Sequence, residues 1–161
     1  MGFKETGIIT YEELVEKQLI PPKERLEKGP IAIAECPEEI PCNICVNACP
    51  FHAIKMEKIY EIPRIDPEKC IGCGVCVPQC PGLAIFVVDL SKPDKAYITL
   101  PYEFIPTPRK GDTVTLLNRT GEPIGEGIVV KAWQYDKTWA VTIEVPKEKW
   151  FEVRSIWIQR R

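Results

Sequence analysis

The segment Cys70-Ile71-Gly72-Cys73-Gly74-Val75-Cys76-Val77-Pro78-Gln79-Cys80-Pro81 decides the fold of this 161-residue chain. Its cysteines follow the spacing C-x2-C-x2-C-x3-C, and a proline comes directly after the last of them. The other four cysteines form an earlier run that Pro50 closes in the same way: Cys36, Cys42, Cys45 and Cys49. Residues 42–54 and 73–85 share their cysteine spacing and the pattern C-P-x-x-A-I. The sequence therefore contains a duplicated half, which predicts pseudo-twofold symmetry.

The spacing of the later run suits a cubane iron–sulfur cluster. A [4Fe–4S] cluster needs a thiolate at each of four iron corners, and cysteines at a stride of three supply three of them from one tight loop. Gly72 and Gly74 lie in that loop, where the lack of a Cβ lets the backbone pass close to inorganic sulfide. Electron transfer is therefore the leading interpretation of the sequence.

Residues 31–92 resemble the bacterial-type ferredoxins that carry two [4Fe–4S] clusters. In that family the last cysteine of each run ligates the cluster of the other run. The resemblance implies two [4Fe–4S] clusters with crossed ligands, one held by Cys36, Cys42, Cys45 and Cys80 and the other by Cys70, Cys73, Cys76 and Cys49.

The first run departs from the regular pattern. Regular spacing would place its first cysteine at position 39, which is Glu39, whereas the nearest upstream thiol is Cys36. The loop is three residues longer, and Pro37 and Pro41 stiffen it. We expect Cys36 to be the ligand, since a longer loop can reach the same iron. Two alternatives stay open: a three-iron cluster with Cys36 free, or ligation by the Glu39 carboxylate.

Other uses of eight cysteines fit less well. Structural zinc sites usually combine two C-x2-4-C pairs across a longer spacer, unlike three cysteines at successive strides of three. Disulfides need an oxidising compartment, and the N-terminus lacks the pattern of a secretory signal peptide. Simple buried thiols would not form two aligned runs. We expect a cytoplasmic protein, and no apolar run approaches the roughly 20 residues that span a bilayer.

The sequence divides into three parts, which predict an α+β fold. Residues 1–30 form an N-terminal extension in which Thr10 and Glu13 have the spacing of a capping box for a short helix ending before Pro21. This extension either packs on the cluster domain or serves as a docking arm. Residues 31–92 form the pseudo-twofold ferredoxin-like domain, and residues 93–161 a small all-β barrel of SH3-like size.

Short apolar runs separated by turn residues predict the strands. In the cluster domain they cover residues 31–34, 62–66 and 84–88, and in the C-terminal part 113–117, 128–130, 139–143 and 151–158. The C-terminal part also holds all four tryptophans, which we expect to fill its core: Trp133, Trp139, Trp150 and Trp157.

Charge argues against nucleic acid as a partner. The formal net charge is −2, and residues 93–161 carry a surplus of only two basic residues, with Arg160 and Arg161 at the end of the chain. That balance is far from the basic face of a nucleic-acid-binding domain. It also lacks the strong acidic field by which many free carriers attract partners. We therefore expect a fixed subunit rather than a diffusing carrier.

No sequence motif indicates a catalytic site in this chain. It has no nucleotide-binding loop, nucleophile elbow or histidine–carboxylate metal motif, and the single histidine, His52, is expected to be structural or exposed. The leading hypothesis is an electron-transfer subunit of a larger oxidoreductase, with a flavoprotein as its redox partner and no catalytic activity alone. A stand-alone ferredoxin with an added β domain is the alternative. A nucleic-acid-binding or redox-sensing iron–sulfur protein is the third hypothesis.

Overall fold

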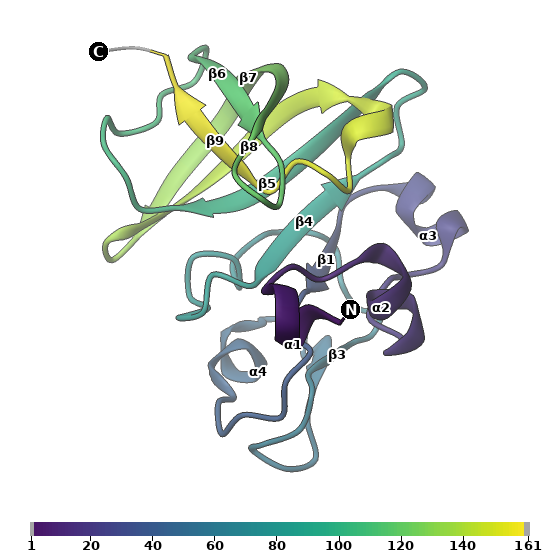
Figure 1. Cartoon of the computed structure of the whole chain (residues 1–161). Coiled ribbons are helices and arrows are strands. Elements are labelled where there is room, and N and C mark those ends of the chain that lie inside the picture. Colours follow the sequence, from purple (N-terminus) through teal and green to yellow (C-terminus); the bar gives the residue numbers. More distant parts are fainter. Residues whose placement is uncertain (1, 160–161) are drawn as a thin grey trace.

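The computed structural model describes residues 2–159 (Figure 1). In chain order, the elements before the second cysteine run are α1 (Phe3–Thr6), α2 (Tyr11–Glu16), α3 (Lys23–Lys28), β1 (Ile31–Ala34), α4 (Ile44–Ala48), β2 (Ile54–Lys55) and β3 (Arg64–Ile65). After that run come β4 (Ile85–Asp89), β5 (Lys95–Tyr102), β6 (Thr113–Leu117), β7 (Pro123–Tyr135), β8 (Thr138–Pro146), the 3-10 helix η1 (Lys147–Lys149) and β9 (Ser155–Ile158).

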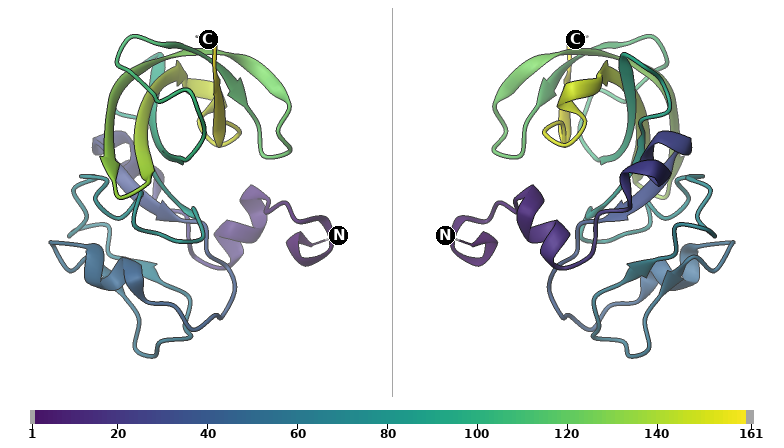
Figure 2. Two further views of the ribbon diagram at one scale, coloured as in Figure 1. Left: turned by 90° about the vertical axis from the view of Figure 1, so that its left-hand side faces the viewer. Right: turned by 90° about the vertical axis from the view of Figure 1, so that its right-hand side faces the viewer.

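Seven strands form one antiparallel sheet in the order β1-β4-β5-β8-β7-β6-β9. The sheet curls around its core (Figure 2). The pairing of β7 with β8 contains a register shift between Val129 and Lys131. Within residues 2–159 no ladder joins the two ends of this order, so the closed barrel of SH3-like size is not confirmed. The α+β class is not confirmed either, because the fold is mostly sheet with four short α-helices in the described part of the chain.

The expected domain boundary near residue 92 falls between two hydrogen-bonded strands. β4 and β5 pair antiparallel, with Val87 opposite Thr99 and Asp89 opposite Tyr97. The strands of the cluster domain therefore continue directly into the C-terminal sheet. The division into three parts stays a prediction.

The pair β1 and β4 is buried on both faces. Alternate side chains of a strand point to opposite faces, and this divides the pair between two cores. The main core takes Ile31, Ile33, Phe86 and Val88, and the second takes Ala32, Ala34, Ile85 and Val87. The second core also contains the buried thiols of Cys45 and Cys76. β1 and β4 thus form a wall between the C-terminal sheet and the cysteine loops, with alanines on the cysteine side.

The N-terminal extension packs on the rest of the chain. The predicted capping box is present, since the Thr10 hydroxyl accepts from the Glu13 amide at 3.2 Å and the Glu13 carboxylate accepts from the Thr10 amide at 2.9 Å. Leu14 is fully buried, and Tyr11 packs edge-to-face on Phe151 with ring centroids 5.3 Å apart. This extension therefore packs in part on the C-terminal segment around Phe151, and its role as a docking arm stays a prediction.

A buried ion cluster joins the first cysteine loop to two connecting segments of the C-terminal sheet, the turn between β6 and β7 and the residues just before β9. Both terminal nitrogens of Arg119 donate to the Glu35 carboxylate at 2.8 Å, and Nε of Arg154 donates to Glu35 Oε2 at 3.0 Å. The three side chains are at most 10% exposed. Burial alone would raise the pKa of Glu35, but the charge of Arg154 and the hydrogen bonds and charge of Arg119 lower that pKa below 4.5. Glu35 is therefore ionised and holds two cations.

Several strands differ from their predicted bounds. The strand expected over 62–66 is confined to Arg64–Ile65, where Pro63 can donate no ladder hydrogen bond. The segment 151–158 becomes a strand only at Ser155, because the amides of Glu152 and Val153 bond back to Lys149 in a turn. Strands β2 and β5 were not predicted from the sequence. The strand predicted over residues 128–130 covers only part of the 13-residue β7.

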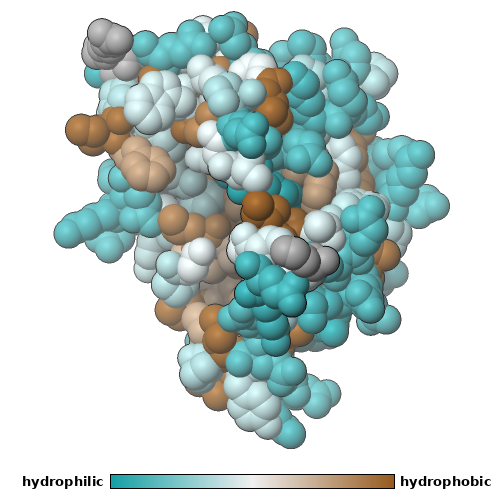
Figure 3. All heavy atoms as spheres, viewed as in Figure 1, coloured by the Kyte–Doolittle hydropathy of each residue, from teal (hydrophilic) through white to brown (hydrophobic). Residues whose placement is uncertain are grey.

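The tryptophans are less buried than predicted. Trp139 and Trp150 are partly buried against the main core, and Trp133 against the second core. The prediction for Trp157 is wrong: its side chain is 68% exposed on the edge strand β9. Figure 3 shows hydrophobic residues reaching the surface in the upper part and in the lower part, where the cysteine loops lie.

We expect Glu35→Gln to lower the free energy of unfolding by about 3–5 kcal/mol, because it leaves two buried guanidinium groups without their carboxylate. Urea unfolding under anaerobic conditions, followed by tryptophan fluorescence, measures the loss. Glu103→Gln removes an exposed carboxylate and should change stability by less than about 0.5 kcal/mol. Equal stability of the two variants would contradict the role assigned to the ion cluster.

Candidate metal-cluster site

Four thiols surround each of two cavities. The first cavity is lined by Cys36, Cys42, Cys45 and Cys80, with Ala34, Ile85, Glu35, Glu38 and Glu61 among its other walls. The second is lined by Cys49, Cys70, Cys73 and Cys76, with Ala32, Phe51, Ile71, Gly72 and Gly74. Each set takes three thiols from one run and one from the other. Among residues 2–159 no group of His, Cys, Asp or Glu side chains has the geometry to hold a single metal ion.

The thiols of the first set influence one another electrostatically. Burial, followed by repulsion from Cys80, Cys36 and Cys42, raises the pKa of Cys45 to about 11. Burial also raises the pKa of Cys36, and electrostatic repulsion from Cys80 and Cys42 raises it further. Despite its longer loop, the irregular Cys36 lines the same cavity as the other three thiols of this set.

The second set shows the same behaviour. Burial, followed by repulsion from Cys70, Cys73 and Cys49, raises the pKa of Cys76 to about 12. At neutral pH the buried thiols of Cys45 and Cys76 are protonated in the free chain. Because a metal-bound cysteine is a thiolate, loading either site releases protons.

Antiparallel strand pairing explains why each set is mixed. β2 leaves the first run and β3 enters the second, and their ladder sets Ile54 opposite Ile65. The same ladder brings Cys49, just before β2, toward Cys70, just after β3. The ladder of β1 and β4 sets Ala34 opposite Ile85, and so brings Cys36 toward Cys80.

Backbone amides point at the thiols that cross between the sets. The Ala53 amide donates to Cys49 Sγ at 3.4 Å, and the Ala84 amide donates to Cys80 Sγ at 3.5 Å. The residue before each alanine has a left-handed backbone, with φ of 54° at His52 and 53° at Leu83. The repeated C-P-x-x-A-I pattern therefore encodes a turn that aims an N–H at the sulfur. The role of His52 in this turn is one of backbone conformation.

An arginine of the N-terminal extension holds the second cysteine loop. Arg25 donates to the carbonyl oxygen of Cys70 at 2.7 Å and to that of Pro67 at 2.7 Å. It also donates to the carbonyl oxygens of Gly29 at 3.1 Å and Pro30 at 3.0 Å. α3 thus supplies a cation beside the thiol set that contains Cys70.

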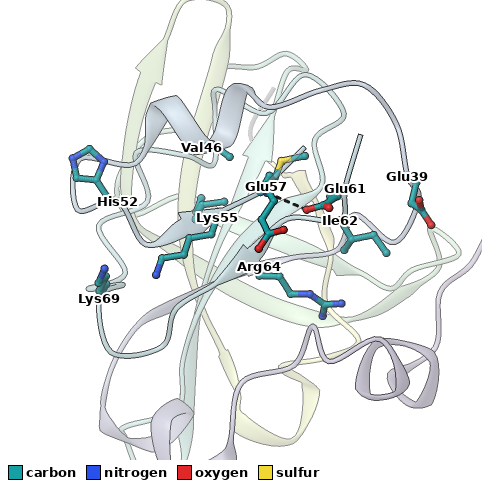
Figure 4. Close-up of a pocket in the computed structure, with 11 residues that line it drawn as sticks. Glu39, Val46, His52, Lys55, Glu57, Glu61, Ile62, Arg64 and Lys69 are labelled. Atoms are coloured by element: carbon teal, nitrogen blue, oxygen red, sulfur yellow. Dashed lines mark hydrogen bonds between the residues drawn. The ribbon is translucent and has the colours of Figure 1, made fainter. Parts of the chain in front are cut away.

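A separate surface hollow of about 900 Å³ contains no cysteine (Figure 4). Its walls include Glu39, His52, Glu57, Glu61 and Arg64, and the only hydrogen bond drawn there runs from the Glu57 amide to Glu61 at 3.0 Å. Glu39, the alternative ligand for the first set, lines this hollow and not the cavity of the four thiols.

Sequence reasoning missed the charged residues that support both cavities. Arg25 is 45 residues from Cys70, and Arg119 and Arg154 are 84 and 119 residues from Glu35. No local motif links such distant residues, so the sequence carried no signal for them.

Comparison with known proteins agrees with the cysteine geometry. A model of the 4Fe-4S dicluster domain matches residues 40–84. The polyferredoxin-like subunit of the aliphatic sulfonate oxidoreductase of Pyrococcus furiosus is 42% identical over 53 residues, which cover 33% of this chain and 28% of that protein. One subunit of the Na⁺-translocating ferredoxin:NAD⁺ oxidoreductase complex of Acetobacterium woodii is 49% identical over 37 residues, 23% of this chain and 11% of that subunit.

The chain also resembles the translation initiation factor RLI1 of Saccharomyces cerevisiae, with 32% identity over 99 residues, 54% of this chain and 16% of that factor. In all three comparisons the chain spans less than a third of the relative's own length. No solved structure matches.

The structure contains no helix in residues 2–159 that is long and apolar enough to cross a membrane. The cysteine spacing, the domain match and the relatives together support iron–sulfur binding and a role in electron transfer. We conclude that this chain contains a 4Fe–4S ferredoxin domain.

Proposed function

We propose that the chain is a cytoplasmic electron-transfer subunit with two [4Fe–4S] clusters, which passes electrons from a flavin or metal centre of a partner protein to an acceptor. Cys36, Cys42, Cys45 and Cys80 hold one cluster, and Cys49, Cys70, Cys73 and Cys76 hold the other. When bound, such clusters supply one-electron chemistry. The observation that carries the proposal is the arrangement of eight thiols as two sets of four, each around its own cavity.

The walls of the cavities support two clusters. Ala32 lines one cavity and Ala34 the other, so the cysteine-facing side of β1 carries only small side chains. Four thiols line each cavity, which suits iron–sulfur chemistry, and the first cavity also has Glu35, Glu38 and Glu61 in its walls. Amide donors to Cys49, Cys80 and Cys70 stabilise negative charge on sulfur, the last from the Ala32 amide at 3.4 Å.

Two glycines fit the second loop against its neighbours. Gly72 has φ of 72°, and a Cβ there would lie 2.4 Å from Pro30 Cβ and 2.5 Å from its carbonyl carbon. Gly74 has φ of 80°, and a Cβ there would lie 2.9 Å from the Trp133 ring. Pro30 and Trp133 close the loop from outside, so these glycines are needed for protein contacts as well as for the approach to sulfide that the sequence predicted.

Exposed apolar side chains near the thiols support a protein partner. They come from the cysteine loops and the residues around them: Ile40, Ile44, Phe51, Ile71, Val75 and Leu83. Cys73 itself is exposed. Apolar groups gathered at an exposed redox site are typical of a docking surface. The relatives in oxidoreductase complexes favour a redox protein as this partner, and we propose a flavoprotein.

Protein purified without oxygen should contain about eight irons and about eight acid-labile sulfides per chain, because each of two cubanes holds four of each. Colorimetric iron and sulfide analysis measures both. A wild-type value near seven irons would contradict ligation by Cys36, and zinc in place of iron would overturn the whole assignment.

Anaerobic isolation from cells that express the protein naturally tests the partner. We expect a stoichiometric complex with a flavin-containing protein, and reduction of the chain's visible chromophore when the substrate of that complex is added. A monomer that a generic reductase reduces would instead support a stand-alone ferredoxin. A salt-sensitive complex with RNA or DNA would contradict the proposal.

Gly72→Ala should lower the iron content from about eight to about four per chain, because its Cβ forces the second cysteine loop away from Pro30. Anaerobic reconstitution followed by iron analysis measures the loss. Gly111→Ala is the matched control, since Gly111 also has positive φ, 94°, but has open space at its Cβ position. The explanation fails if both variants bind iron equally well.

A further inference from the structure

Each thiol set has its own arginine support, and both arginine systems connect the cysteine loops to other parts of the chain. Beside the first set, Glu35 directly precedes Cys36 in sequence and lines the same cavity as the four thiols. Beside the second set, Arg25 is bonded to the carbonyl oxygen of Cys70. The hydrogen bonds of Arg25 and those of Arg119 and Arg154 go to different residues, so the two systems can act separately.

The ion cluster beside the first set has an excess of positive charge. It combines one carboxylate, Glu35, with two guanidinium groups, Arg119 and Arg154. Burial lowers the pKa of Arg154 to about 10, which leaves it charged at neutral pH. Its Nη2 is buried without a hydrogen-bond partner among the described residues. The carboxylate thus compensates only part of the charge that the two arginines bring.

Aromatic rings hold both guanidinium groups in place. Arg119 lies over the Phe151 ring at 3.7 Å from its centroid, and Arg154 lies 4.9 Å from the centroid of Phe86. Phe86 belongs to β4, the strand that the second cysteine run enters. The positive charge is therefore fixed in a water-poor region around Glu35, the member of the ion cluster that lines the first cavity.

The charge beside the second set is of a different kind. Arg25 donates four hydrogen bonds to backbone carbonyl oxygens, and none of these four goes to a carboxylate. Arg25 belongs to α3 and is partly buried, with its side chain bonded to the carbonyl oxygens of Pro67 and Cys70. Arg25 thus places a positive charge against the backbone of a residue in the second thiol set.

We propose that these two arginine systems set the reduction potentials of the two clusters independently: Arg119 and Arg154 raise the potential at the first thiol set, and Arg25 raises it at the second. This inference rests on the proposed function. Reduction adds negative charge to a cluster, and a nearby cation stabilises the reduced state. Arg119, Arg154 and Arg25 are positioning and charge-supplying residues, and none of them is a ligand.

Burial decides which charges matter. Two other carboxylates line the cavity of the first set: Glu38, which is exposed and screened by water, and Glu61, which is only half-buried. The ion cluster is at most 10% exposed, so its field is screened much less. Removing one buried positive charge should therefore lower a potential more than removing an exposed one.

The test is a redox titration of the loaded full-length protein, followed by electron paramagnetic resonance, in four single variants. Arg119→Gln leaves Glu35 and Arg154 as a balanced pair, and we expect one of the two reduction steps to become about tenfold less favourable. For a one-electron step this corresponds to about 59 mV toward negative potential. Arg25→Gln should shift the other step in the same direction. Arg119→Lys keeps the positive charge, so both of its reduction potentials should stay near those of the wild-type protein.

Arg109→Gln is the matched control, because it removes an exposed arginine and should move neither step. Iron and sulfide contents of every sample are measured first, so a wild-type protein without two clusters contradicts the proposed function rather than this inference. With two clusters present, the inference is overturned if Arg119→Gln and Arg25→Gln shift the same step, if neither shifts a step, or if Arg119→Lys shifts it as far as Arg119→Gln.

Discussion

Two short antiparallel ladders control the whole cysteine region. β1 pairs with β4, and β2 pairs with β3, so the strand that enters one run lies beside the strand that leaves the other. Ladder hydrogen bonds fix this register, and the register carries the last thiol of each run into the set of the other. Crossed thiol sets are therefore a consequence of backbone pairing, and the side chains need only be cysteines at the right distance from the strand ends.

The same pairing links the cysteine region to the rest of the molecule. β1 and β4 present large side chains to the main core and the alanines of β1 to the cysteine side, and β4 continues the sheet into β5. The ion cluster of Glu35, Arg119 and Arg154 then connects the loop after β1 to the β6–β7 turn and to the segment just before β9. A disturbance of the C-terminal sheet can thus reach the thiols through packed and ionic contacts.

Features that repeat along the chain, or that involve residues close together in sequence, could be predicted from the sequence. The cysteine runs, the capping box at Thr10 and the strand over residues 31–34 follow from spacing and local pattern, and the structure contains the last two as predicted. The sequence could not reveal contacts such as that between Arg25 and Cys70, because these depend on the tertiary fold. Trp157 failed as a core prediction because it alternates with the buried Ile156 and Ile158 along β9 and so lies on the outer face of that strand. Ligation by the eight cysteines stays a prediction.

The most direct test of the central claim is an anomalous diffraction map, recorded at the iron absorption edge, from anaerobically grown crystals of the loaded protein. We predict two separate iron sites, with Cys80 bound beside Cys36, Cys42 and Cys45, and with Cys49 bound at the other site. The crossed arrangement would be contradicted if the map showed the four cysteines of each run bound to one and the same cluster.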